Sequence, residues 1–477
     1  MFTPQDLEQI QAHGITPSGV EQQINNFEQG FPSLPVLRAA AVGDGILRLS
    51  EQELQSAAEW YEQQLDKLKV VKFVPASGAA TRMFKELFEF VGEDKRTGGI
   101  DKLLQNIEKF AFYPELKALL PADADDKAIV SAIIGEGLNY GSKPKGLVTF
   151  HSYEDGARKA IEEHLVEAAL YGSNNGVANI HFTVSPEHKA SFMELLEVVV
   201  PRHSAKFGVE YNISFSEQSP ATDTVAVNPD NTLFRTESGA LLFRPAGHGA
   251  LLENLNAIDA DLVFIKNIDN VTTDALKGDT ITYKKALAGV LLTLQEQVFE
   301  YLKALEVGGA EMEPIAEFIE QKLCVKLPSS YGAQSLSEIL ERPMRVCAMV
   351  RNEGEPGGGP YWVKDTQGYE TLQIAESSQI SKEDAHLMKE ATHFNPADLI
   401  CAVKDSRGKK FNLKEFVDYS TGFISEKSSG GRPLRAQELP GLWNGSMAKW
   451  NTIFVEVPVS TFSPVKVVQD LLREQHQ

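Results

Sequence analysis

The segment at residues 70–85 has the residue types of a phosphate-binding turn. Apolar β-formers at 70–74 are typical of a buried strand, and the small residues at 76–81 follow closely. Where a strand passes through such a turn into a helix, backbone N–H groups converge and can bind an anion. Arg82 and Lys85 add positive charge in the predicted helix. The alternative is a turn whose small residues serve helix–strand packing alone.

A carboxylate follows a second apolar segment. The run at residues 262–265 is Leu-Val-Phe-Ile, and Asp269 lies four positions after its end. In open α/β sheets ligands bind beyond the carboxyl ends of the strands. Mg²⁺ prefers oxygen ligands and usually takes one or two protein carboxylates together with substrate phosphates. Asp269 is therefore a candidate metal ligand, the alternative being a side chain that caps the next turn.

Three further segments carry residues that could contact a nucleotide. Gly247 and Gly249 flank His248 just before a predicted helix, where close backbone approach would admit a flat base or a ribose. Lys145 precedes a predicted strand, and Lys466 lies between an apolar strand and a predicted terminal amphipathic helix. The alternatives are an exposed histidine in a turn and two solvated lysines.

The order of predicted elements favours an α/β fold. Strands alternate with helices between residues 70 and 305, a pattern that implies right-handed βαβ units and a mostly parallel sheet covered on both faces. Residues 1–69 are predicted to be helical, and residues 86–142 to be a helical insertion. From residue 344 onward, strand-like runs between Gly- and Pro-rich turns indicate more antiparallel structure. The predicted strands are 70–74, 146–150, 178–184, 209–215 and 262–265, and the predicted helices include 154–171, 249–258 and 284–305.

Several of these segments, taken in order, resemble motifs of one enzyme family. Residues 77–83 read Ser-Gly-Ala-Ala-Thr-Arg-Met, and the segment Phe-Ser-Pro-Val-Lys at 462–466 precedes Asp-Leu-Leu at 470–472. They resemble the glycine-rich GGxGTRL signature and the FLPVK…DLL ending of sugar-nucleotide pyrophosphorylases of the UDP-glucose and UDP-N-acetylhexosamine type. Shorter matches lie at Pro144–Lys145, Gln218 with Pro220, 245–249, 267–270, 373–376, 394–395 and 437–438. The chain also resembles a related bacterial family filed as domain of unknown function 4301.

This resemblance implies a three-layer nucleotidyltransferase fold, GT-A-like and Rossmann-like, with a mixed, mostly parallel sheet. It would carry the helical insertion at 86–142 and an elaborated C-terminal half. The implied domains are an N-terminal helical segment (1–69), a nucleotide-binding α/β core (70–343) and a C-terminal, sugar-binding half (344–477).

The resemblance further implies a reaction between a nucleoside triphosphate and a sugar 1-phosphate, with UTP favoured, to give a nucleotide sugar and pyrophosphate. Asp269 would hold Mg²⁺, and Arg82, Lys145 and Lys466 would be catalytic. The residues implied in substrate binding are Ser77, Gly78, Ala79, Thr81, Lys85, Gln218, Gly247, His248, Gly249, Glu376 and Asn395.

The glycine-rich turn departs from the family pattern. Ser77 and Ala80 replace two glycines of the signature, and Phe84 replaces a later one. These departures keep a second hypothesis open, a non-catalytic regulatory relative that binds sugar nucleotides. A third hypothesis is a glycosyltransferase on the same kind of fold, which would release a nucleoside diphosphate.

Composition narrows the class of protein. The 477 residues carry a formal net charge of −20, a poor match for nucleic acid or anionic lipid. The three cysteines have no metal-binding spacing, and the longest apolar run, at 286–292, is far too short for a membrane span. With no signal-peptide pattern at the N-terminus, the sequence predicts a cytoplasmic protein with no membrane partner.

Overall fold

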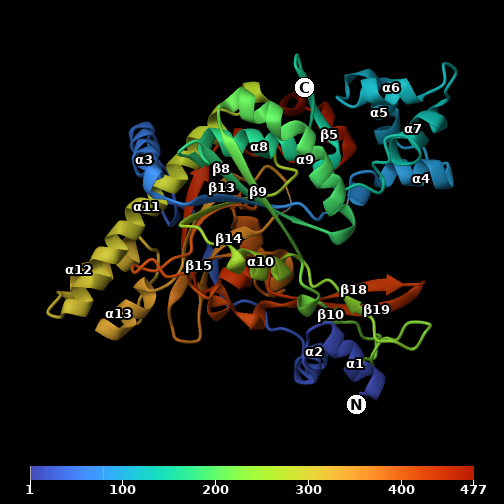
Figure 1. Cartoon of the computed structure of the whole chain (residues 1–477). Coiled ribbons are helices and arrows are strands. Elements are labelled where there is room, and N and C mark those ends of the chain that lie inside the picture. The colour runs from blue at the N-terminus through green and yellow to red at the C-terminus, as the bar shows by residue number, and fades with distance from the viewer. Residues whose placement is uncertain (1, 79, 356) are drawn as a thin grey trace. The chain divides into compact units, whose positions relative to one another are not determined.

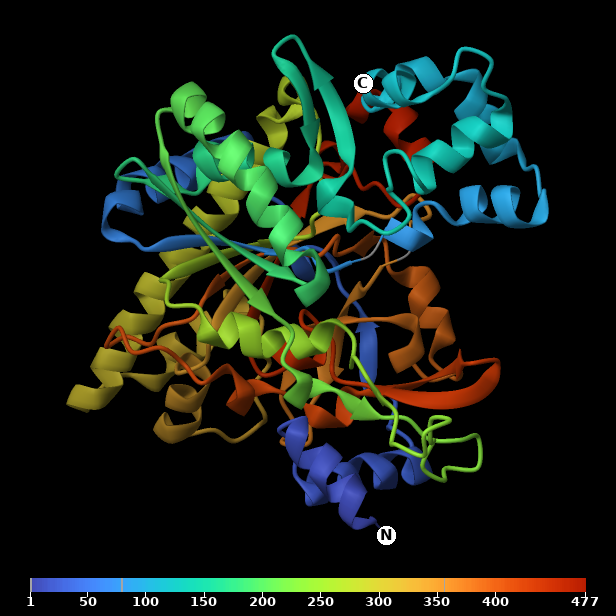
Figure 2. The same cartoon turned by 45° about the vertical axis from the view of Figure 1, so that its right-hand side comes forward.

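The computed structural model describes residues 2–78, 80–355 and 357–477 of the chain, shown in Figures 1 and 2. The chain forms two compact units, and neither is continuous in sequence. The three predicted ranges, 1–69, 70–343 and 344–477, are continuous and stay a prediction. Unit 1 comprises Met1–Gln52, Gln218–Leu262 and Leu287–Val457, and unit 2 comprises Glu53–Glu217, Val263–Ala286 and Pro458–Gln477.

The sheet strands of unit 2 are mostly parallel. β8 (Val177–Val184) pairs in parallel with β4 (Val70–Pro75) and with β9 (Glu210–Glu217), and β12 (Leu262–Lys266) lies next to β4. The short β7 (Ser173–Asn174) is antiparallel to β8. β12 is buried along its whole length, as expected for a strand covered on both faces. Helices α8 (Ala160–Tyr171) and α9 (Pro186–Phe207) pack on these strands through one apolar cluster that includes Ile161, Phe182, Phe192 and Leu196.

The predicted insertion at 86–142 is helical in the structure. Its helices are α4 (Lys85–Glu93), α5 (Gly98–Gln105), α6 (Tyr113–Leu119) and α7 (Asp126–Ile134), which gather in one group in Figure 1. They share an apolar cluster that includes Phe84, Leu87, Phe112 and Ile133 and extends to Val465 and Val468 near the C-terminus. The insertion therefore packs against the segment that carries Lys466.

Two local predictions in unit 2 are wrong. Residues 145–147 form a 3₁₀ turn, and the strand begins only at Thr149, as β5 (Thr149–Tyr153) paired with β6 (Gly156–Lys159). The helix predicted from 154 consequently begins at Ala160. Residues 468–472 and 474–476 form 3₁₀ turns, not an amphipathic α-helix. The Asp470 carboxylate bonds the backbone before it, which favours a tight turn.

Unit 1 mixes parallel and antiparallel pairings. From residue 344 onward most of the pairings are antiparallel, as the strand-like runs between Gly- and Pro-rich turns indicate. β13 (Met344–Arg351) is parallel to β20 (Asn451–Val457) and antiparallel to β16 (His393–Phe394) and β17 (Asp398–Ala402). A second, antiparallel sheet has the order β1 (Val36–Ala39), β14 (Gly359–Lys364), β15 (Glu370–Ala375). The smaller pairings are β2 (Ala41–Val42) with β3 (Gly45–Leu47), β10 (Thr224–Val225) with β11 (Phe243–Arg244), and β18 (Phe423–Ser429) with β19 (Arg432–Glu438).

The all-helical prediction for residues 1–69 is wrong at β1, β2 and β3. Gly43 and Gly45 both have positive φ, 87° and 95°, and form the tight turn that lets short apolar stretches pair as strands. No helix in the described part of the chain is long and apolar enough to cross a membrane. The remaining helices are α1 (Pro4–Ala12), α2 (Pro17–Gln29), α3 (Glu51–Gln64), α10 (Leu252–Ala257), α11 (Gly278–Val307), α12 (Met312–Gln321), α13 (Ala333–Leu340) and α14 (Ala385–Glu390).

Candidate functional site

Backbone hydrogen bonds join four distant segments of unit 2 at the carboxyl ends of β4 and β12. The segment after β12 bonds to the end of β4, and the 143–147 segment bonds to the turn after β4. The 463–470 segment bonds to the segment after β12 and to the turn after β4. The bonds run from Ile268 N to Pro75 O (3.3 Å), Lys145 N to Gly78 O (3.3 Å), Val465 N to Asp269 O (3.0 Å) and Val468 N to Met83 O (3.2 Å). Residues hundreds of positions apart are thereby held together.

Asp269 lies at the centre of this group. Its Oδ2 accepts a hydrogen bond from Lys145 Nζ at 2.7 Å, and Lys466 Nζ lies 3.4 Å from the same oxygen. Lys145 also donates to the Val465 carbonyl at 2.7 Å. Asp269 is 7% exposed, whereas the Lys466 side chain is 58% exposed. The structure thus places one buried carboxylate between two ammonium groups, one of them open to solvent.

The two lysines keep Asp269 ionised. Burial raises the pKa of the carboxyl, but the charges of Lys145 and Lys466 outweigh it, so the pKa lies below the usual range. The ion pairs leave a net positive charge at the cluster, which suits it to a second anion. A phosphate group carries the negative charge that such a cluster would attract.

Asp470 positions the backbone of Lys466. Its Oδ2 accepts hydrogen bonds from Lys466 N (2.7 Å) and Val467 N (2.9 Å), and Arg473 pairs with its Oδ1 at 2.8 Å. The aspartate is 5% exposed. It therefore orients the chain at Lys466 without using the Lys466 ammonium group.

Asp470→Ala is expected to weaken the use of phosphate substrates without abolishing it. Two charge-assisted hydrogen bonds to backbone N–H groups are lost, and the Lys466 ammonium group is no longer held in register. We expect kcat/KM for the reaction proposed below to fall by about tenfold, mostly through KM. Steady-state kinetics test this, with Asp470→Asn expected to retain more activity than Asp470→Ala. Equal kcat/KM in wild type and Asp470→Ala would contradict the positioning role.

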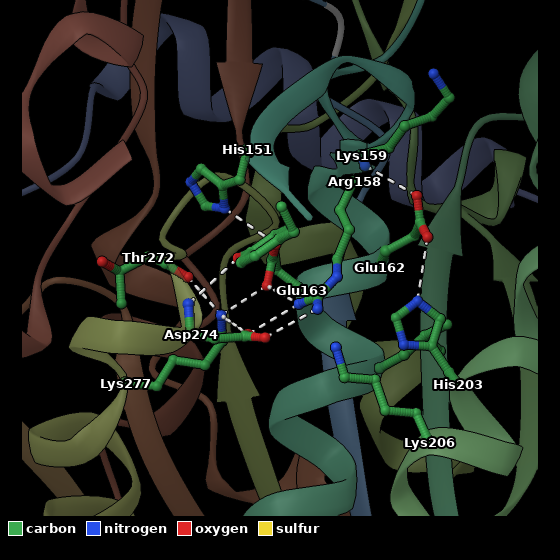
Figure 3. A network of polar contacts seen from close by, with 12 residues as sticks. His151, Arg158, Lys159, Glu162, Glu163, His203, Lys206, Thr272, Asp274 and Lys277 are labelled. Atoms are coloured by element: carbon green, nitrogen blue, oxygen red, sulfur yellow. Dashed lines mark hydrogen bonds and ion pairs between the residues drawn. The ribbon is translucent and has the colours of Figure 1, made fainter. Parts of the chain in front are cut away.

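A buried polar network holds the segment that follows Asp269 (Figure 3). Glu163 on α8 accepts hydrogen bonds from Lys277 (2.6 Å) and Tyr153 (2.8 Å), and His151 Nδ1 lies 3.0 Å from it. Lys277 also donates to the Thr272 carbonyl. Three residues beyond Asp269, the chain is therefore tied to α8 through buried charges.

The C-terminal residues join the same network. His476 is 2% exposed, stacks on His151, and has its Nδ1 2.9 Å from His151 Nε2. The Gln475 carbonyl accepts hydrogen bonds from Thr272 Oγ1 (2.9 Å) and Thr273 N (3.2 Å). The C-terminal residues are thus bonded to His151 and to the segment that follows Asp269.

His476 gives stability a predictable pH dependence. Burial, and next the electrostatic effect of the neighbouring His151 ring, lower the pKa of His476 to about 3. The unfolded residue takes up a proton near its ordinary pKa of about 6.5, so between pH 6.5 and 3 the unfolded chain binds more protons and stability falls as pH falls. For this residue alone the loss between pH 7 and pH 5 is about 2 kcal/mol. Urea unfolding of wild type and His476→Gln at both pH values measures it. An identical pH dependence in the two proteins would contradict this assignment.

A second buried charge cluster lies on β4, β12 and α8. Glu167 accepts hydrogen bonds from Lys72 (2.6 Å), Lys266 (2.7 Å) and Tyr171 (2.8 Å), and all four side chains are buried. On α8, His164 Nε2 lies 3.2 Å from the Ile268 carbonyl, directly before Asp269. Sequence reasoning missed this cluster because single charged residues inside apolar strands do not reveal their partners.

The turn after β4 differs in detail from the prediction. Arg82 lies in a 3₁₀ turn, Ala80–Arg82, and α4 begins only at Lys85. The predicted passage directly into a helix is therefore wrong, because Phe84 is fully buried and takes a non-helical conformation at the N-cap. Arg82 and Thr81 are exposed, and Arg82 forms no ion pair with the described residues. Lys85 is 76% exposed and pairs with Glu89 at 3.6 Å.

The other residues predicted in this turn differ in how exposed they are. Ser77 is partly buried, and Gly78 is exposed and accepts the Lys145 backbone bond. Ala79 lies outside the described residues. No contact among the described residues joins Arg82, Lys85 or Thr81 to Asp269. The backbone of the turn is therefore next to the Asp269 cluster, while its cationic side chains extend into solvent.

The remaining predicted residues belong to unit 1, and two of them lie close together. His248 stacks on Trp443 with ring centres 4.2 Å apart, and its Nε2 lies 3.9 Å from Glu376 Oε1. Asn444 donates to Glu376 at 3.1 Å. The nearby His248 ring lowers the pKa of Glu376. Trp443 and Asn444 were missed because no motif marks them.

The glycines beside His248 serve chain packing. Gly247 has a φ of 76°, and a Cβ there would lie 2.6 Å from Glu438 Oε2. A Cβ on Gly249 would lie 2.1 Å from the Pro440 carbonyl oxygen. The close approach that these glycines permit is therefore to residues 438–440 of the chain itself. This favours the alternative of a turn, although the His248 side chain is partly buried and not fully exposed.

Gln218 and Asn395 do not join the His248 group through any contact among the described residues. Gln218 donates to Thr222 at 3.4 Å. Asn395 is buried, and its amide donates to the Ala348 carbonyl (2.8 Å) and accepts from Ala397 N (2.9 Å). Its side chain thus ties the connection between β16 and β17 to β13, so the structure gives it a structural role.

In the part of the chain that the structure describes, no group of three or more His, Cys, Asp or Glu side chains could hold a metal ion. Asp269 is then a single carboxylate. A metal bound there would need its other ligands from a substrate or from water.

Among solved structures, the chain is similar to the uridine diphosphate N-acetylglucosamine pyrophosphorylase from Trypanosoma brucei in complex with inhibitor. The TM-score is 0.50 at 13% identity, over 95% of this chain and 74% of that one. A mutant of UDP-glucose pyrophosphorylase from Leishmania major in complex with UDP-glucose aligns with a TM-score of 0.47 at 14% identity, over 99% and 79% of the two chains. A search among curated proteins found no matching sequence.

The likeness to the Trypanosoma brucei structure extends over nearly all of this chain and confirms the predicted α/β nucleotidyltransferase type of fold. The match to a protein family is equally extensive and includes both units. It runs over residues 3–477. The chain therefore belongs to the family described as Domain of unknown function (DUF4301).

Proposed function

We propose that the chain is a nucleotidyltransferase that joins a sugar 1-phosphate to a nucleoside triphosphate, with UTP favoured, and releases pyrophosphate. One observation carries the proposal: Asp269, Lys145 and Lys466 meet at one point although 124 and 197 residues separate the lysines from the aspartate. The fold shared with a UDP-N-acetylglucosamine pyrophosphorylase supports the same reaction class.

The chemistry requires alignment and charge neutralisation more than acid–base catalysis. An oxygen of the sugar phosphate attacks the α-phosphorus, and the bond to the pyrophosphate group breaks. The nucleophile is already an anion, so no strong general base is needed. In our proposal Lys145 and Lys466 hold oxygens of the sugar phosphate and the α-phosphate, exchanging part of their contact with Asp269 for the substrate. Arg82 would contact the departing pyrophosphate from the exposed turn.

Asp269 is the residue that would hold Mg²⁺. Both lysines lie on Oδ2, and neither contacts Oδ1, so one carboxylate oxygen remains for a cation. Bound there with substrate, Mg²⁺ would supply charge neutralisation at the phosphates. The low pKa of Asp269 keeps that oxygen anionic at neutral pH.

In the same proposal, the His248 group of unit 1 would contact the base or the sugar. Trp443 and His248 offer a stacked aromatic surface, and Glu376 offers a carboxylate acceptor for sugar hydroxyls. Among the predicted residues, Gln218 and Asn395 have less support, because each is bonded within the chain.

A second candidate is a non-catalytic protein that binds sugar nucleotides. It is favoured by Ala80 and Phe84, which stand at glycine positions of the family signature. Both are fully buried in the apolar cluster of the helical insertion. They serve packing where the signature would allow close approach of phosphate, and this could remove turnover while the Asp269 cluster still binds.

Pyrophosphate release across a matrix of nucleoside triphosphates and sugar 1-phosphates separates the two candidates. We expect release with Mg²⁺ for at least one pair that contains UTP. A glycosyltransferase would instead release a nucleoside diphosphate from a UDP-sugar, which is supplied with an acceptor in a separate reaction. Thermal stabilisation by a UDP-sugar with no release from any pair would favour the non-catalytic candidate.

A further inference from the structure

Unit 1 contains a cavity of about 620 Å³ to which the proposed reaction assigns no role. One wall is formed by β14 and β15, which contribute Val363, Thr371 and Gln373. The others come from the loop at 32–35, from Arg342, and from residues 418–421 and 448–449. The volume is in the range of cavities that hold small molecules.

Arg342 lines this cavity and also a second cavity of unit 1, and it adds a positive charge to the lining. It is partly buried, and its guanidinium group forms no hydrogen bond or ion pair with any residue that the structure describes. Its nearest aromatic contact is Tyr369, with the guanidinium carbon 6.0 Å from the ring centre. Burial lowers the pKa of Arg342, which the charge of Asp365 only partly offsets. A guanidinium group carries five N–H donors, and leaving them desolvated and unpaired is unfavourable.

The carboxylates of the cavity are already engaged. Asp365 Oδ1 accepts hydrogen bonds from Gln367 N and Tyr369 N, both at 2.9 Å. Asp418 Oδ1 accepts from Ser420 N at 3.0 Å and from Ser420 Oγ at 2.6 Å. Neither forms an ion pair with Arg342, and both are held by their own turns.

Two lysines add to the positive charge. Lys364 and Lys449 line the cavity, are exposed, and form no ion pair with the described residues. The lining thus holds three cationic side chains and two carboxylates. The carboxylates accept hydrogen bonds within their own turns, whereas the three cations form no ion pair in the described part of unit 1. The surplus charge and the free donors both favour an anionic ligand.

Buried neutral groups complete the lining. Thr371, Gln373 and Thr421 are 6%, 6% and 5% exposed. The Gln373 amide makes a single hydrogen bond to the described residues, from Nε2 to Thr371 Oγ1 at 3.5 Å. Most of the hydrogen-bonding capacity of a buried amide is therefore left for a ligand in the cavity.

We propose that this cavity is a binding site for a small anion of the phosphate or carboxylate class, with the Arg342 guanidinium group as its principal contact. The Gln373 amide and the threonine hydroxyls suit hydroxyl groups on the same ligand. The two sources of such an anion are the free inorganic ion and a phosphorylated or carboxylated sugar. The cavity is lined by residues of unit 1, whereas the Asp269 cluster is formed by residues of unit 2, and the proposal does not depend on the proposed reaction.

Calorimetric titration of the full chain tests the site. Because the Asp269 cluster also attracts phosphate, the titrations use Lys466→Ala as the background protein. The probes are glucose 1-phosphate, glucuronate, inorganic phosphate and neutral glucose. We expect the anions to bind and Arg342→Gln to weaken their binding by at least about tenfold, the loss typical of a hydrogen bond to a charged group.

The arms of this experiment distinguish the two sources. Glucose 1-phosphate binding more tightly than inorganic phosphate would identify a sugar-borne anion, and equal affinities would identify the free ion. Unchanged affinity in Arg342→Gln, or neutral glucose binding as tightly as glucose 1-phosphate, would overturn the proposal. Failure of the proposed reaction would appear elsewhere, as an absence of turnover in the wild-type protein.

Two further variants serve as a control and as a replacement for Arg342→Gln. Arg351→Gln removes an exposed arginine of the same unit that does not line the cavity, and it should bind the probes as the background protein does. If circular dichroism shows that Arg342→Gln does not fold, the surface double variant Lys364→Gln with Lys449→Gln replaces it. That variant should weaken anion binding by roughly threefold at low salt. No change in affinity there would count against the site.

Discussion

Asp269→Ala and Lys466→Ala should each lower kcat of the proposed reaction by at least about a hundredfold. Removing one charge-assisted contact aimed at the transition state typically costs roughly 3–4 kcal/mol. Lys466 presents an exposed ammonium group 3.4 Å from the Asp269 carboxylate, so its loss removes a phosphate contact. Loss of Asp269 removes the carboxylate for the cation and leaves Lys145 without its ion pair. Single-turnover rates of pyrophosphate release measure both effects.

A matched surface variant gives the baseline for this comparison. Lys127→Ala removes an exposed lysine of the same unit, paired with Asp94 on the surface, and should leave kcat unchanged within about twofold. Thermal unfolding of each variant must show a folded protein. A folded Asp269→Ala that turns over at the wild-type rate would remove Asp269 from the mechanism.

Glu167→Gln should lower the free energy of unfolding by about 3–5 kcal/mol. Glu167 is fully buried and is the shared partner of the Lys72 and Lys266 ammonium groups. Burial raises its pKa, but the charges of Lys266 and Lys72 outweigh that and hold it well below the usual range. Burial also lowers the pKa of Lys72 to about 7, which the charge of Glu167 opposes. The amide would leave two buried cations with no counter-charge. Urea denaturation followed by circular dichroism gives the value.

The control for Glu167→Gln is the same substitution in a surface ion pair. Glu89 pairs with Lys95 at 2.5 Å and with Lys85 at 3.6 Å on α4. Glu89→Gln should leave the unfolding free energy close to that of the wild type, because a solvent-exposed ion pair contributes little. A similar small effect for Glu167→Gln would show that the buried cluster contributes little to stability.

The parts of the fold that follow from hydrophobic pattern are the ones that sequence reasoning finds. The continuous apolar run ending at Ile265 predicts β12, and Ser185 followed by Pro186 predicts the start of α9. The short β1, β2 and β3 were missed because they are two to four residues long and depend on glycine turns. The 3₁₀ turns near the C-terminus were missed because the hydrogen bonds of Asp470 override a helical pattern.

For the candidate site, the residue types in the sequence predict only part of each role. The rest depends on which residues the fold brings together. Asp269 is recognisable from its place after a buried strand, but its ion pairs with Lys145 and Lys466 depend on the contacts between distant segments. Asn395 matches a family motif, yet its amide is used within the chain. Glu163, Glu167 and His476 carry no motif, and their partners lie far away in sequence. Burial and pairing, which decide their roles, are properties of the folded chain.

The central claim is that the Asp269, Lys145 and Lys466 cluster binds the phosphates of a nucleotide. A crystal structure of the full chain grown with UTP and Mg²⁺ tests it most directly. The account predicts triphosphate oxygens within hydrogen-bond distance of the Lys145 and Lys466 ammonium groups, with the cation on Asp269. UTP bound with its phosphates away from both lysines, while the Asp269 ion pairs remain intact, would contradict it.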